Sequence, residues 1–561
     1  MKLSGAQITI KQLERCGINI ISGIPGGSNL PIYDAILDSN IKSIITRHEQ
    51  GAAFIAQGMA RSTGKAAVCF ATSGPGATNL ITGIADAMAD SIPIVAITGQ
   101  VPTSLIGTNA FQEVDFIAMT KSICKKCYAI KSADELITAI PEAIKLAESG
   151  RPGPVVIDIP KDIQNQIIEF DSWPEIQKCT DNSITQSTAK KLESAAKLIN
   201  SSERPLMFIG GGAIHSESTE DIIEIAHKNN IPVITSLMGI GAFPSSNQLN
   251  LGMIGMHGKK SANMIMHESD TIIALGVRFG DRSTGNTNKF CPGSKIIHID
   301  IDTSEIDKNI SSYIGINCDL KAGLEHISPL IESNTRSKWL SQINGIRIRY
   351  DLDCDQQINL PRNLFNLISE VIDEDTIITT DVGQHQMWAA QYGSYSKPRS
   401  FLTSGGIGTM GFGLPAAIGA ALANPDKKIV CISGDGSIQM NIQELATMAE
   451  HNLNISLIII NNQQFGMVKQ QQELFFNARY SSSRFATSPD FSLIAQGYGI
   501  YIYHPAKSGE YSAAISAAIN HSGPCVIDLP FDDSESVFPI VPPGSANTDP
   551  ICGESKLKEA S

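Results

Sequence analysis

Short aliphatic runs alternate with amphipathic stretches along almost the whole chain. The runs at 66–72, 205–209 and 455–460 contain few polar residues and lack a period of two, which is typical of parallel strands covered on both faces. The stretches at 6–17 and 49–61 place their apolar residues near helical spacing instead. This repeated strand-and-helix order predicts an α/β protein built from doubly wound parallel sheets.

The alternation falls into three blocks, separated by stretches near 163–187 and 346–360 that we expect to be connections. A chain of 561 residues is long enough for several domains, each with its own core. The pattern predicts three doubly wound domains followed by an extended tail, with the bounds 1–170, 188–345, 361–540 and 541–561.

The sequence Ser-Gly-Asp-Gly-Ser at 433–437 directly follows an apolar run, and 438–450 then shows the spacing of a helix. The next apolar run ends at Asn461-Asn462. Open α/β sheets bind ligands at the carboxyl ends of their strands, and glycine amides at a helix start favour phosphate. Carboxylate and carboxamide oxygens suit Mg²⁺. The spacing therefore predicts a metal–diphosphate site, although Gly-Asp-Gly alone is more often only a turn.

Glu49 is the second candidate, because it follows one predicted strand and opens a helix. The helix dipole favours an acidic residue in the first turn whatever its function, so a purely structural role stays open. Loops at 23–27, 73–79 and 99–100 follow other strands of the same block, which favours a ligand-binding face. A carboxyl group sheltered from water there would have a raised pKa and could exchange a proton with a ligand.

Charge and composition exclude several classes of function. The net charge is −13 with no long basic run, so we expect no nucleic-acid partner. No apolar stretch has the length of a membrane span, and the N-terminus has no signal-peptide core. The 11 cysteines are scattered, which favours reduced thiols in the cytoplasm, and we interpret the pair Cys124 and Cys127 as structural.

The motifs together resemble the large catalytic subunit of acetohydroxyacid synthase (acetolactate synthase), a family of thiamine diphosphate-dependent enzymes, and most of all its bacterial isozyme I type. The Gly-Asp-Gly and Asn-Asn pair resembles the thiamine diphosphate motif itself. The agreement runs from about residue 4 to residue 550 and includes GIPGGS (23–28), RHEQGAA (47–53), SGPGATN (73–79), GTNAFQEVD (107–115), RPGPVVIDIPKD (151–162), LGMIGMHG (251–258), TTDVGQHQMW (379–388), SGGIGTMGFGLPAAIGA (404–420) and VPPGSANT (541–548).

The resemblance implies thiamine diphosphate, Mg²⁺ and a structural, non-redox FAD as cofactors. It makes the three domains pyrimidine-binding, FAD-binding and diphosphate-binding, in that order. The residues implied to contact thiamine diphosphate are Pro75, Asn79, Gly383, Gln384, His385, Gly408, Met410, Gly434, Asp435, Gly436, Ser437, Asn462, Gly466 and Met467. The implied Mg²⁺ ligands are Asp435, Asn462 and the backbone carbonyl of Gln464.

Catalytic roles follow from the same resemblance. Glu49 would touch N1′ of the aminopyrimidine, Met410 would force the cofactor to bend, and Arg282 would meet the carboxylate of the acceptor. The other residues implied at the substrate are Gly26, Phe111, Gln112, Lys161 and Gln471.

A glycine run at 210–212 and the acidic strand end at Asp300 suit a phosphate and a ribose hydroxyl, although a surface turn explains them equally well. The residues that match the family's FAD contacts are Arg151, Gly210, Gly211, Leu251, Met253, His257, Gly276, Arg278, Arg282, Asp300, Ile301 and Asp319.

Two departures from the family pattern bear on the site. Gly280 stands where the family usually has an aspartate, which we expect to weaken FAD binding. Gln471 stands where many members have a tryptophan that favours 2-ketobutyrate over pyruvate as acceptor. One methylene is worth about 1–3 kcal/mol, so we expect a weak preference for 2-ketobutyrate here.

The implied reaction decarboxylates pyruvate and condenses the two-carbon unit with a second pyruvate or with 2-ketobutyrate, which opens branched-chain amino acid biosynthesis. Because Glu49 and the Gly-Asp-Gly turn lie in different blocks, the resemblance implies a homodimer or tetramer with the site between subunits. It also implies a small regulatory subunit.

The alternative is a pyruvate oxidase-like enzyme with an active flavin. Glyoxylate carboligase is disfavoured because it has an aliphatic residue at the position of Glu49, and a silent cofactor-binding subunit because Glu49, Asp435, Asn462 and Arg282 are all present.

Overall fold

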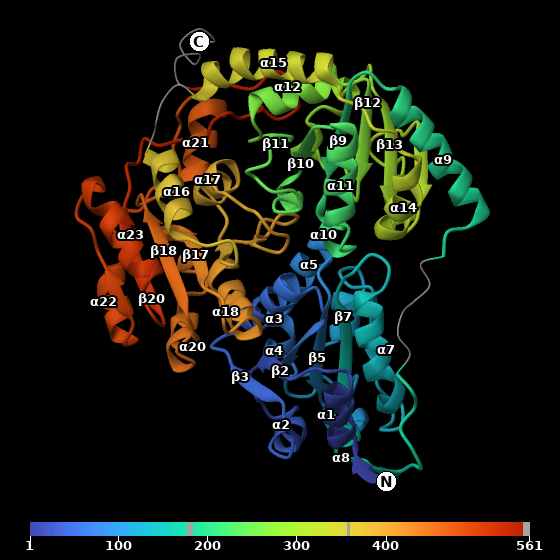
Figure 1. The fold of residues 1–561 in the computed structure, drawn as a ribbon. Helices are drawn as coiled ribbons and strands as arrows, with labels where there is room; N and C mark the ends of the chain where they lie inside the picture. The colour runs from blue at the N-terminus through green and yellow to red at the C-terminus, as the bar shows by residue number, and fades with distance from the viewer. Residues whose placement is uncertain (177–182, 356–359, 554–561) are drawn as a thin grey trace.

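The structure is a computed structural model that describes residues 1–176, 183–355 and 360–553. The described chain forms three six-stranded sheets, each wholly parallel, and one short antiparallel pair. Figure 1 shows the three units as a blue group at the bottom, a green group at the upper right and an orange-to-red group at the left. The prediction of three parallel-sheet α/β units is confirmed.

The first unit has the strand order β3-β2-β4-β5-β7-β6, with the fully buried β4 and β5 at its centre. Its strands are β2 (Ile20–Gly23), β3 (Lys42–Ile45), β4 (Ala67–Ala71), β5 (Ile94–Gln100), β6 (Lys126–Ala129) and β7 (Val155–Pro160). Its helices are α1 (Gly5–Arg15), α2 (Leu30–Ile36), α3 (Glu49–Thr63), α4 (Pro75–Asn79), α5 (Ile81–Asp90), α6 (Phe116–Thr120), α7 (Leu136–Glu148) and α8 (Lys161–Asn165).

The second unit has the order β11-β10-β9-β12-β13-β14. Its strands are β9 (Pro205–Ile209), β10 (Val233–Thr235), β11 (Asn250–Met253), β12 (Thr271–Leu275), β13 (Lys295–Asp300) and β14 (Ile314–Asn317). Its helices are α9 (Gln186–Ser201), α10 (Gly211–His215), α11 (Thr219–Asn229), α12 (Lys260–Glu268), α13 (Asp281–Thr284), α14 (Leu320–Ile327) and α15 (Ser337–Asp355).

The third unit has the order β16-β15-β17-β18-β20-β19. Its strands are β15 (Ile377–Thr380), β16 (Phe401–Leu402), β17 (Ile429–Gly434), β18 (Ile455–Asn461), β19 (Tyr501–Tyr503) and β20 (Cys525–Pro530). Its helices are α16 (Leu360–Val371), α17 (Gln384–Tyr392), α18 (Gly413–Ala423), α19 (Asp435–Ile438), α20 (Leu445–Glu450), α21 (Gly466–Phe475), α22 (Phe491–Gly497) and α23 (Tyr511–Ile519).

Helices α3 and α18 join the first unit to the third, and they lie side by side in Figure 1. They approach closely because glycines face backbone at two points. A Cβ on Gly58 would overlap the carbonyl oxygen of Ala416, and a Cβ on Gly419 would overlap that of Ile55. This contact fixes the position of Glu49, at the start of α3, relative to the third unit.

Two expectations for secondary structure are wrong. The helix expected at 438–450 is broken into α19, a 3₁₀ turn (Ile442–Glu444) and α20. The break lies at Asn441, whose buried side chain donates to the carbonyl oxygen of Gly411 instead of facing along a helix. The connection expected near 346–360 is helix up to Asp355, because α15 packs on α12 of the second unit.

The other stretches expected to be irregular are held by the neighbouring units. Strand β8 (Ile167–Glu169) pairs with β1 (Lys2–Ser4), and the next described residues pack there too, since the Arg15 guanidinium lies over the ring of Trp173. The part of 163–187 at 177–182 lies outside the described residues. The tail has little regular structure, but Ala546 forms a bridge with Gly285 of the second unit.

The cysteines whose side chains the structure describes are free thiols, with the exception of Cys552. Eight described cysteines are free thiols, including Cys124 and Cys127, whose sulfur atoms are 3.0 Å apart. Cys552 is disulfide-bonded, so it is not one of the reduced thiols that the sequence favours.

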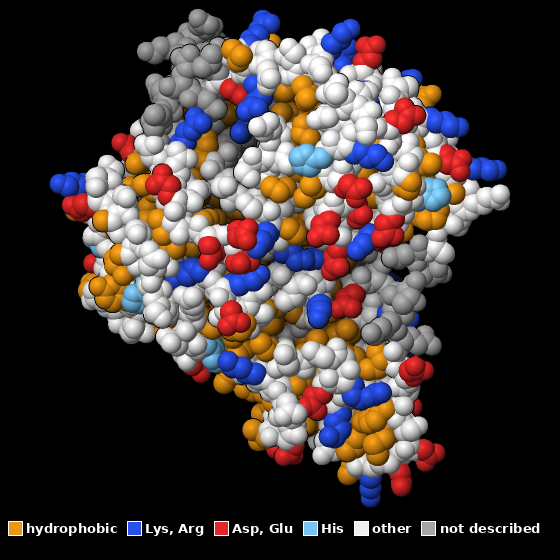
Figure 2. Space-filling model, in the orientation of Figure 1, with side chains coloured by type: hydrophobic (Ala, Val, Ile, Leu, Met, Phe, Trp, Pro, Cys, Tyr) orange, Lys and Arg blue, Asp and Glu red, His pale blue; other side chains and the backbone are white. Residues whose placement is uncertain are grey.

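Acidic and basic side chains are interspersed on the face of the molecule drawn in Figure 2. Among the residues that the structure describes, no helix combines the length and the apolar character that a membrane crossing requires.

Candidate active site

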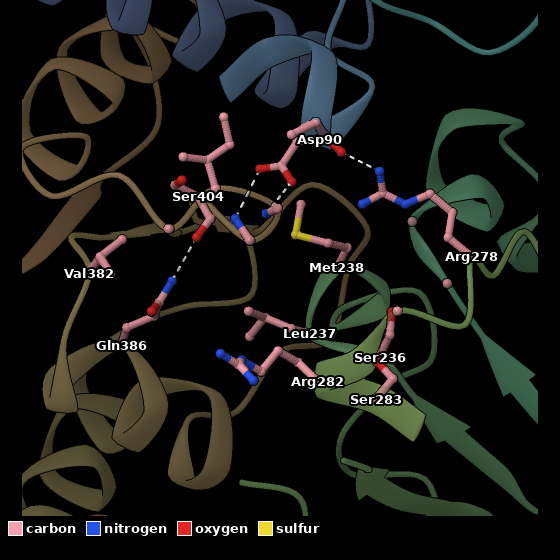
Figure 3. A pocket seen from close by; sticks show the side chains of 18 of the residues that line it. Asp90, Ser236, Leu237, Met238, Arg278, Arg282, Ser283, Val382, Gln386 and Ser404 are labelled. Atoms are coloured by element: carbon pink, nitrogen blue, oxygen red, sulfur yellow. Dashed lines mark hydrogen bonds between the residues drawn. The ribbon is translucent and has the colours of Figure 1, made fainter. Parts of the chain in front are cut away.

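A cavity of about 1660 Å³ lies where the three units meet, and Figure 3 shows part of its wall. The expected thiamine diphosphate and metal residues that line it are Gly383, Gln384, His385, Gly408, Met410, Gly434, Asp435, Gly436, Ser437, Asn462, Gln464, Gly466 and Met467. The expected FAD residues that line it are Arg151, Gly210, Gly211, Met253, His257, Gly276, Arg278, Arg282, Asp300, Ile301 and Asp319. Gln471 lines it as well. One hollow therefore joins both expected cofactor sites.

Asp435 and Asn462 lie together because β17 and β18 are parallel neighbours, with Gly434 opposite Ile460. Asp435 is 1% exposed, and burial raises its pKa to about 7 although nearby backbone N–H groups lower it. Its Oδ2 atom has no hydrogen-bond partner. A buried carboxylate oxygen without a donor fits a divalent cation, which would replace the missing partner.

The side chain of Gln384 orients the Asn462 carboxamide. Asn462 Nδ2 donates to Gln384 Oε1 over 3.1 Å, so the carboxamide oxygen is the atom left for a cation. Gln384 is itself held, because its Nε2 donates to the carbonyl oxygen of Glu535 over 2.9 Å.

Gly436 and His385 both line this end of the cavity. A Cβ on Gly436 would lie 2.7 Å from the Phe465 ring, so this position has room only for glycine and leaves its backbone uncovered by a side chain of its own. His385 is buried beside Gly434, and burial lowers its pKa to about 3. Its Nε2 atom has no hydrogen-bond partner. Backbone amides and an uncharged imidazole fit a diphosphate at the start of α19.

The three consecutive glutamines of α21 have different surroundings. Gln470 is buried, and its Nε2 donates to the carbonyl oxygen of Val537 over 2.8 Å. Gln472 donates to the carbonyl oxygen of Ser481 over 2.8 Å and accepts from the Ser483 hydroxyl over 2.7 Å. Gln471 is the exposed member and lines the cavity, so it is the one placed to touch a ligand.

The second-unit end of the cavity has buried carboxylates beside basic side chains. Asp300 ends β13, and burial raises its pKa to about 6. Arg151 of the first unit pairs with Glu305 over 2.8 Å and with Asp302 over 3.2 Å. Buried carboxylates at a strand end beside a glycine turn fit a ligand with hydroxyl and phosphate groups, as FAD has. A Cβ on Gly280 would meet nothing within 4 Å, so the missing aspartate leaves open space.

A second group of expected residues does not reach this cavity. Its members are Glu49, Gly26, Gln112, Lys161, Pro75, Asn79 and the 88% exposed Phe111. They lie at the carboxyl edge of the first unit, where Asn79 Nδ2 donates to Glu49 Oε2 over 2.9 Å. Leu251, expected at the FAD, is also absent from the cavity wall because it is buried in the core of the second unit. Within one chain, the two halves of the expected thiamine diphosphate site are therefore separate.

Four buried carboxylates bear on the site although no motif assigned them a role, and one of them, Asp381, lies inside the motif at 379–388. Glu444 contacts the turn before Glu49, and Asp86 and Asp90 contact the loop before α18. Asp381 accepts from the backbone nitrogen of Gly411 over 2.8 Å, and burial raises its pKa to about 6. The signal available in the sequence was weak: an acidic residue inside an apolar helix or directly after an apolar strand.

Comparison with known proteins assigns a separate family model to each of the three units. Residues 3–119 match the family model of the thiamine pyrophosphate enzyme N-terminal TPP binding domain. Residues 192–327 match the central domain of the same enzymes, and residues 381–529 match their C-terminal TPP binding domain.

Relatives match over nearly the full chain. It is 45% identical to the acetolactate synthase isozyme 1 large subunit of Escherichia coli (strain K12), with 98% of each chain covered. It is 44% identical to a probable acetolactate synthase large subunit of Methanocaldococcus jannaschii, over 99% of this chain and 97% of that one. It is 41% identical to acetolactate synthase 2, chloroplastic, of Nicotiana tabacum, over 98% and 85%. The chain belongs to the thiamine pyrophosphate enzymes, in the family of acetolactate synthase large subunits.

Proposed function

We propose that the protein is an acetolactate synthase, a thiamine diphosphate-dependent transferase. It decarboxylates pyruvate and joins the two-carbon fragment to a second pyruvate, giving 2-acetolactate, or to 2-ketobutyrate, giving 2-aceto-2-hydroxybutyrate. This is the first common step of branched-chain amino acid biosynthesis. The observation that carries the proposal is a single cavity that joins the Asp435 edge to Arg282 and Gln471, so that a cofactor and two keto acids have one place to meet.

Asp435, Asn462 and the backbone carbonyl of Gln464 would hold Mg²⁺, and the glycine amides at 434–436 with His385 would hold the diphosphate. When bound, thiamine diphosphate supplies a nucleophilic carbon and an electron sink for the bond to the departing CO₂. Glu49 would hold or release a proton at the aminopyrimidine N1′. Met410, which lines the cavity wall, would orient the two rings.

Arg282 would bind the carboxylate of the acceptor keto acid. Its side chain is 71% exposed and pairs with the adjacent, similarly exposed Asp281 over 3.1 Å, so the guanidinium faces solvent and is available for a bidentate bond. Gln471 would lie beside the methyl group that distinguishes 2-ketobutyrate from pyruvate. The FAD residues would hold a flavin with no redox role, and Gly280 would weaken but not abolish its binding.

The separation of Glu49 from the cavity supports a homodimer or tetramer in which each site takes Glu49 from one copy and Asp435 from another. We further propose a small regulatory subunit as partner and the cytoplasm as location. The domain bounds 1–170, 188–345, 361–540 and 541–561 remain our proposal.

The test is the product formed from pyruvate by the purified protein with thiamine diphosphate and Mg²⁺, with and without added FAD. We expect acetolactate without oxygen uptake. Acetyl phosphate together with peroxide would identify a pyruvate oxidase-like enzyme instead. No turnover at all, despite bound thiamine diphosphate, would point to a silent subunit.

A further inference from the structure

The loop at 404–411, between β16 and α18, has a glycine-rich backbone with little conformational preference of its own. Half of its residues are glycine, and Gly408 and Gly411 have φ values of 69° and 88°. Glycine has the largest backbone freedom to lose on folding. Yet Gly408 and Met410 of this loop line the cavity. Contacts from outside the loop must therefore fix it.

Asp90 of the first unit holds the first half of the loop. Its Oδ2 accepts from the backbone nitrogen of Gly405 over 2.9 Å, and its Oδ1 accepts from that of Gly406 over 2.7 Å. Figure 3 shows this carboxylate aimed at the loop from the end of α5. Both donors are backbone groups, so the bonds fix the path of the chain rather than a side chain.

Asp86, one turn earlier in α5, holds the second half. Its Oδ1 accepts from the Thr409 hydroxyl over 2.8 Å and from the hydroxyl of Ser404. The Ser404 oxygen in turn accepts from the Thr409 backbone nitrogen over 2.8 Å. Asp86 thus closes the loop on itself immediately before Met410.

Burying these carboxylates costs free energy unless hydrogen bonds and an opposite charge compensate for it. Asp86 and Asp90 are 0% and 4% exposed, and Asp90 lies at the C-terminal end of a helix, where the dipole disfavours a negative charge. Arg61 pairs with both, at 3.3 Å and 2.8 Å. It also donates to the carbonyl oxygen of Thr403 over 2.9 Å, directly before the loop.

We propose that Asp86 and Asp90 are positioning residues that hold the 404–411 loop, and with it Met410, in the shape that thiamine diphosphate requires. The first unit thereby shapes a wall of the site that the third unit forms. This inference deepens the proposed function and rests on it for the role of Met410.

The experiment compares wild type with Asp90→Asn, Thr409→Val and Thr409→Ser. Hydrogen exchange of the Gly405 and Gly406 amides should be at least about 10-fold faster in Asp90→Asn, because local opening sets the rate. Calorimetric titration with thiamine diphosphate and Mg²⁺ should show about 10-fold weaker binding in Asp90→Asn and Thr409→Val, since misplaced groups near a ligand cost about that much or more. Thr409→Ser keeps the hydroxyl and should bind as wild type does.

Asp270→Asn is the matched control, because Asp270 accepts from the backbone nitrogens of Glu203 and Arg204 in the second unit, away from the loop. It should change neither loop exchange nor thiamine diphosphate binding. Folded Asp90→Asn protein with wild-type exchange and affinity would overturn the inference, as would equal affinities of Thr409→Val and Thr409→Ser. If Asp90→Asn does not fold, the threonine pair decides. Both readouts are independent of turnover, so a wild type that makes no acetolactate would defeat the proposed function and leave this test standing.

Discussion

Glu444 of the third unit lies against Arg47 of the first, with its Oε1 atom 2.9 Å from the Arg47 backbone nitrogen. The same oxygen accepts from the backbone nitrogen of His48 over 3.2 Å, and Oε2 accepts from the Thr447 hydroxyl over 2.6 Å. The carboxylate is fully buried, which raises its pKa. The turn that presents Glu49 is therefore fastened to the third unit of its own chain.

Glu444→Ala should destabilise the protein and disturb Glu49. The substitution leaves two partly buried backbone N–H groups without their acceptor, and a fully buried group of this kind costs about 1–3 kcal/mol. We expect the free energy of unfolding to fall by about 1–3 kcal/mol and turnover at saturating pyruvate to become slower. Denaturant titration and steady-state kinetics measure the two effects.

Glu450→Ala is the control for this prediction, because Glu450 pairs with the same Arg47 at the surface over 2.6 Å. Exposed pairs contribute about 0–1 kcal/mol, so this variant should resemble wild type. Equal stability of the two variants would show that Glu444 does not fasten the turn.

Glu49→Gln should slow turnover by about 10²–10⁴-fold, because the amide keeps the shape but cannot exchange a proton at the aminopyrimidine. Calorimetry should still detect thiamine diphosphate binding, since the residues proposed to hold the diphosphate lie on the third unit. Asn79→Ala removes the hydrogen bond to Glu49 Oε2 but leaves the carboxyl group in place, so it should have a smaller effect. Near-normal turnover of Glu49→Gln would refute the role assigned to this carboxylate.

The fold was predictable because its strands are almost uninterrupted aliphatic runs. Strand β9 has the same bounds as the run at 205–209, β18 extends one residue beyond the run at 455–460, and β4 is one residue shorter at each end than the run at 66–72. The prediction failed at 438–450, where helical spacing is present but Asn441 bonds to a carbonyl oxygen thirty positions away in the sequence. A tertiary hydrogen bond of this kind overrides a local pattern.

The candidate site was predictable only where a motif names it. Asp435 and Asn462 were found from their spacing after two apolar runs. Glu444, Asp86 and Asp90 were missed because they act on backbone N–H groups or hydroxyls more than 300 positions away. Almost every residue has the same backbone N–H donor, so the sequence does not indicate which of them a distant carboxylate will bind.

Gln471→Trp should raise the preference for 2-ketobutyrate over pyruvate by about 10-fold or more, since a ring placed against one extra methyl group gains about 1–3 kcal/mol. Product ratios at fixed concentrations of both acceptors measure this preference. Gln471→Leu is the control, because it is apolar but lacks the flat surface, and it should change the ratio less. A wild type that already strongly prefers 2-ketobutyrate would contradict the assignment of Gln471.

His257 should make the cofactor-free protein less stable in acid. It is buried, its Nδ1 lies 3.2 Å from the Pro539 carbonyl oxygen, and burial lowers its pKa from 6.5 to about 4. In the unfolded chain His257 is protonated below about pH 6.5, but in the folded chain it stays neutral down to about pH 4. The stability that is present above pH 6.5 is therefore lost as the pH falls. The loss is about 1.4 kcal/mol per pH unit in that window, or about 3 kcal/mol in all.

His257→Asn keeps a donor for the Pro539 carbonyl oxygen but does not titrate. Thermal unfolding of wild type and variant at pH 7.5 and pH 5 should therefore show a smaller acid-induced drop in Tm for the variant. Equal drops would mean that His257 is protonated as readily in the folded chain as in the unfolded one.

Mixed dimers should recover activity from two inactive variants. Under the proposed function, Glu49→Gln and Asp435→Asn each remove a group that every site of a homodimer would use, so each alone should be nearly inactive. In a mixed dimer, one site combines both substitutions and the other has neither. Random assembly of equal amounts makes about half of the dimers mixed, and a two-fold dimer has two sites, so activity should reach about a quarter of wild type. Glu49→Gln mixed with Glu49→Asn is the control and should stay inactive. If the first mixture also stays inactive after the chains have exchanged, Glu49 and Asp435 do not meet across a subunit interface, and the chain itself must close to bring them together.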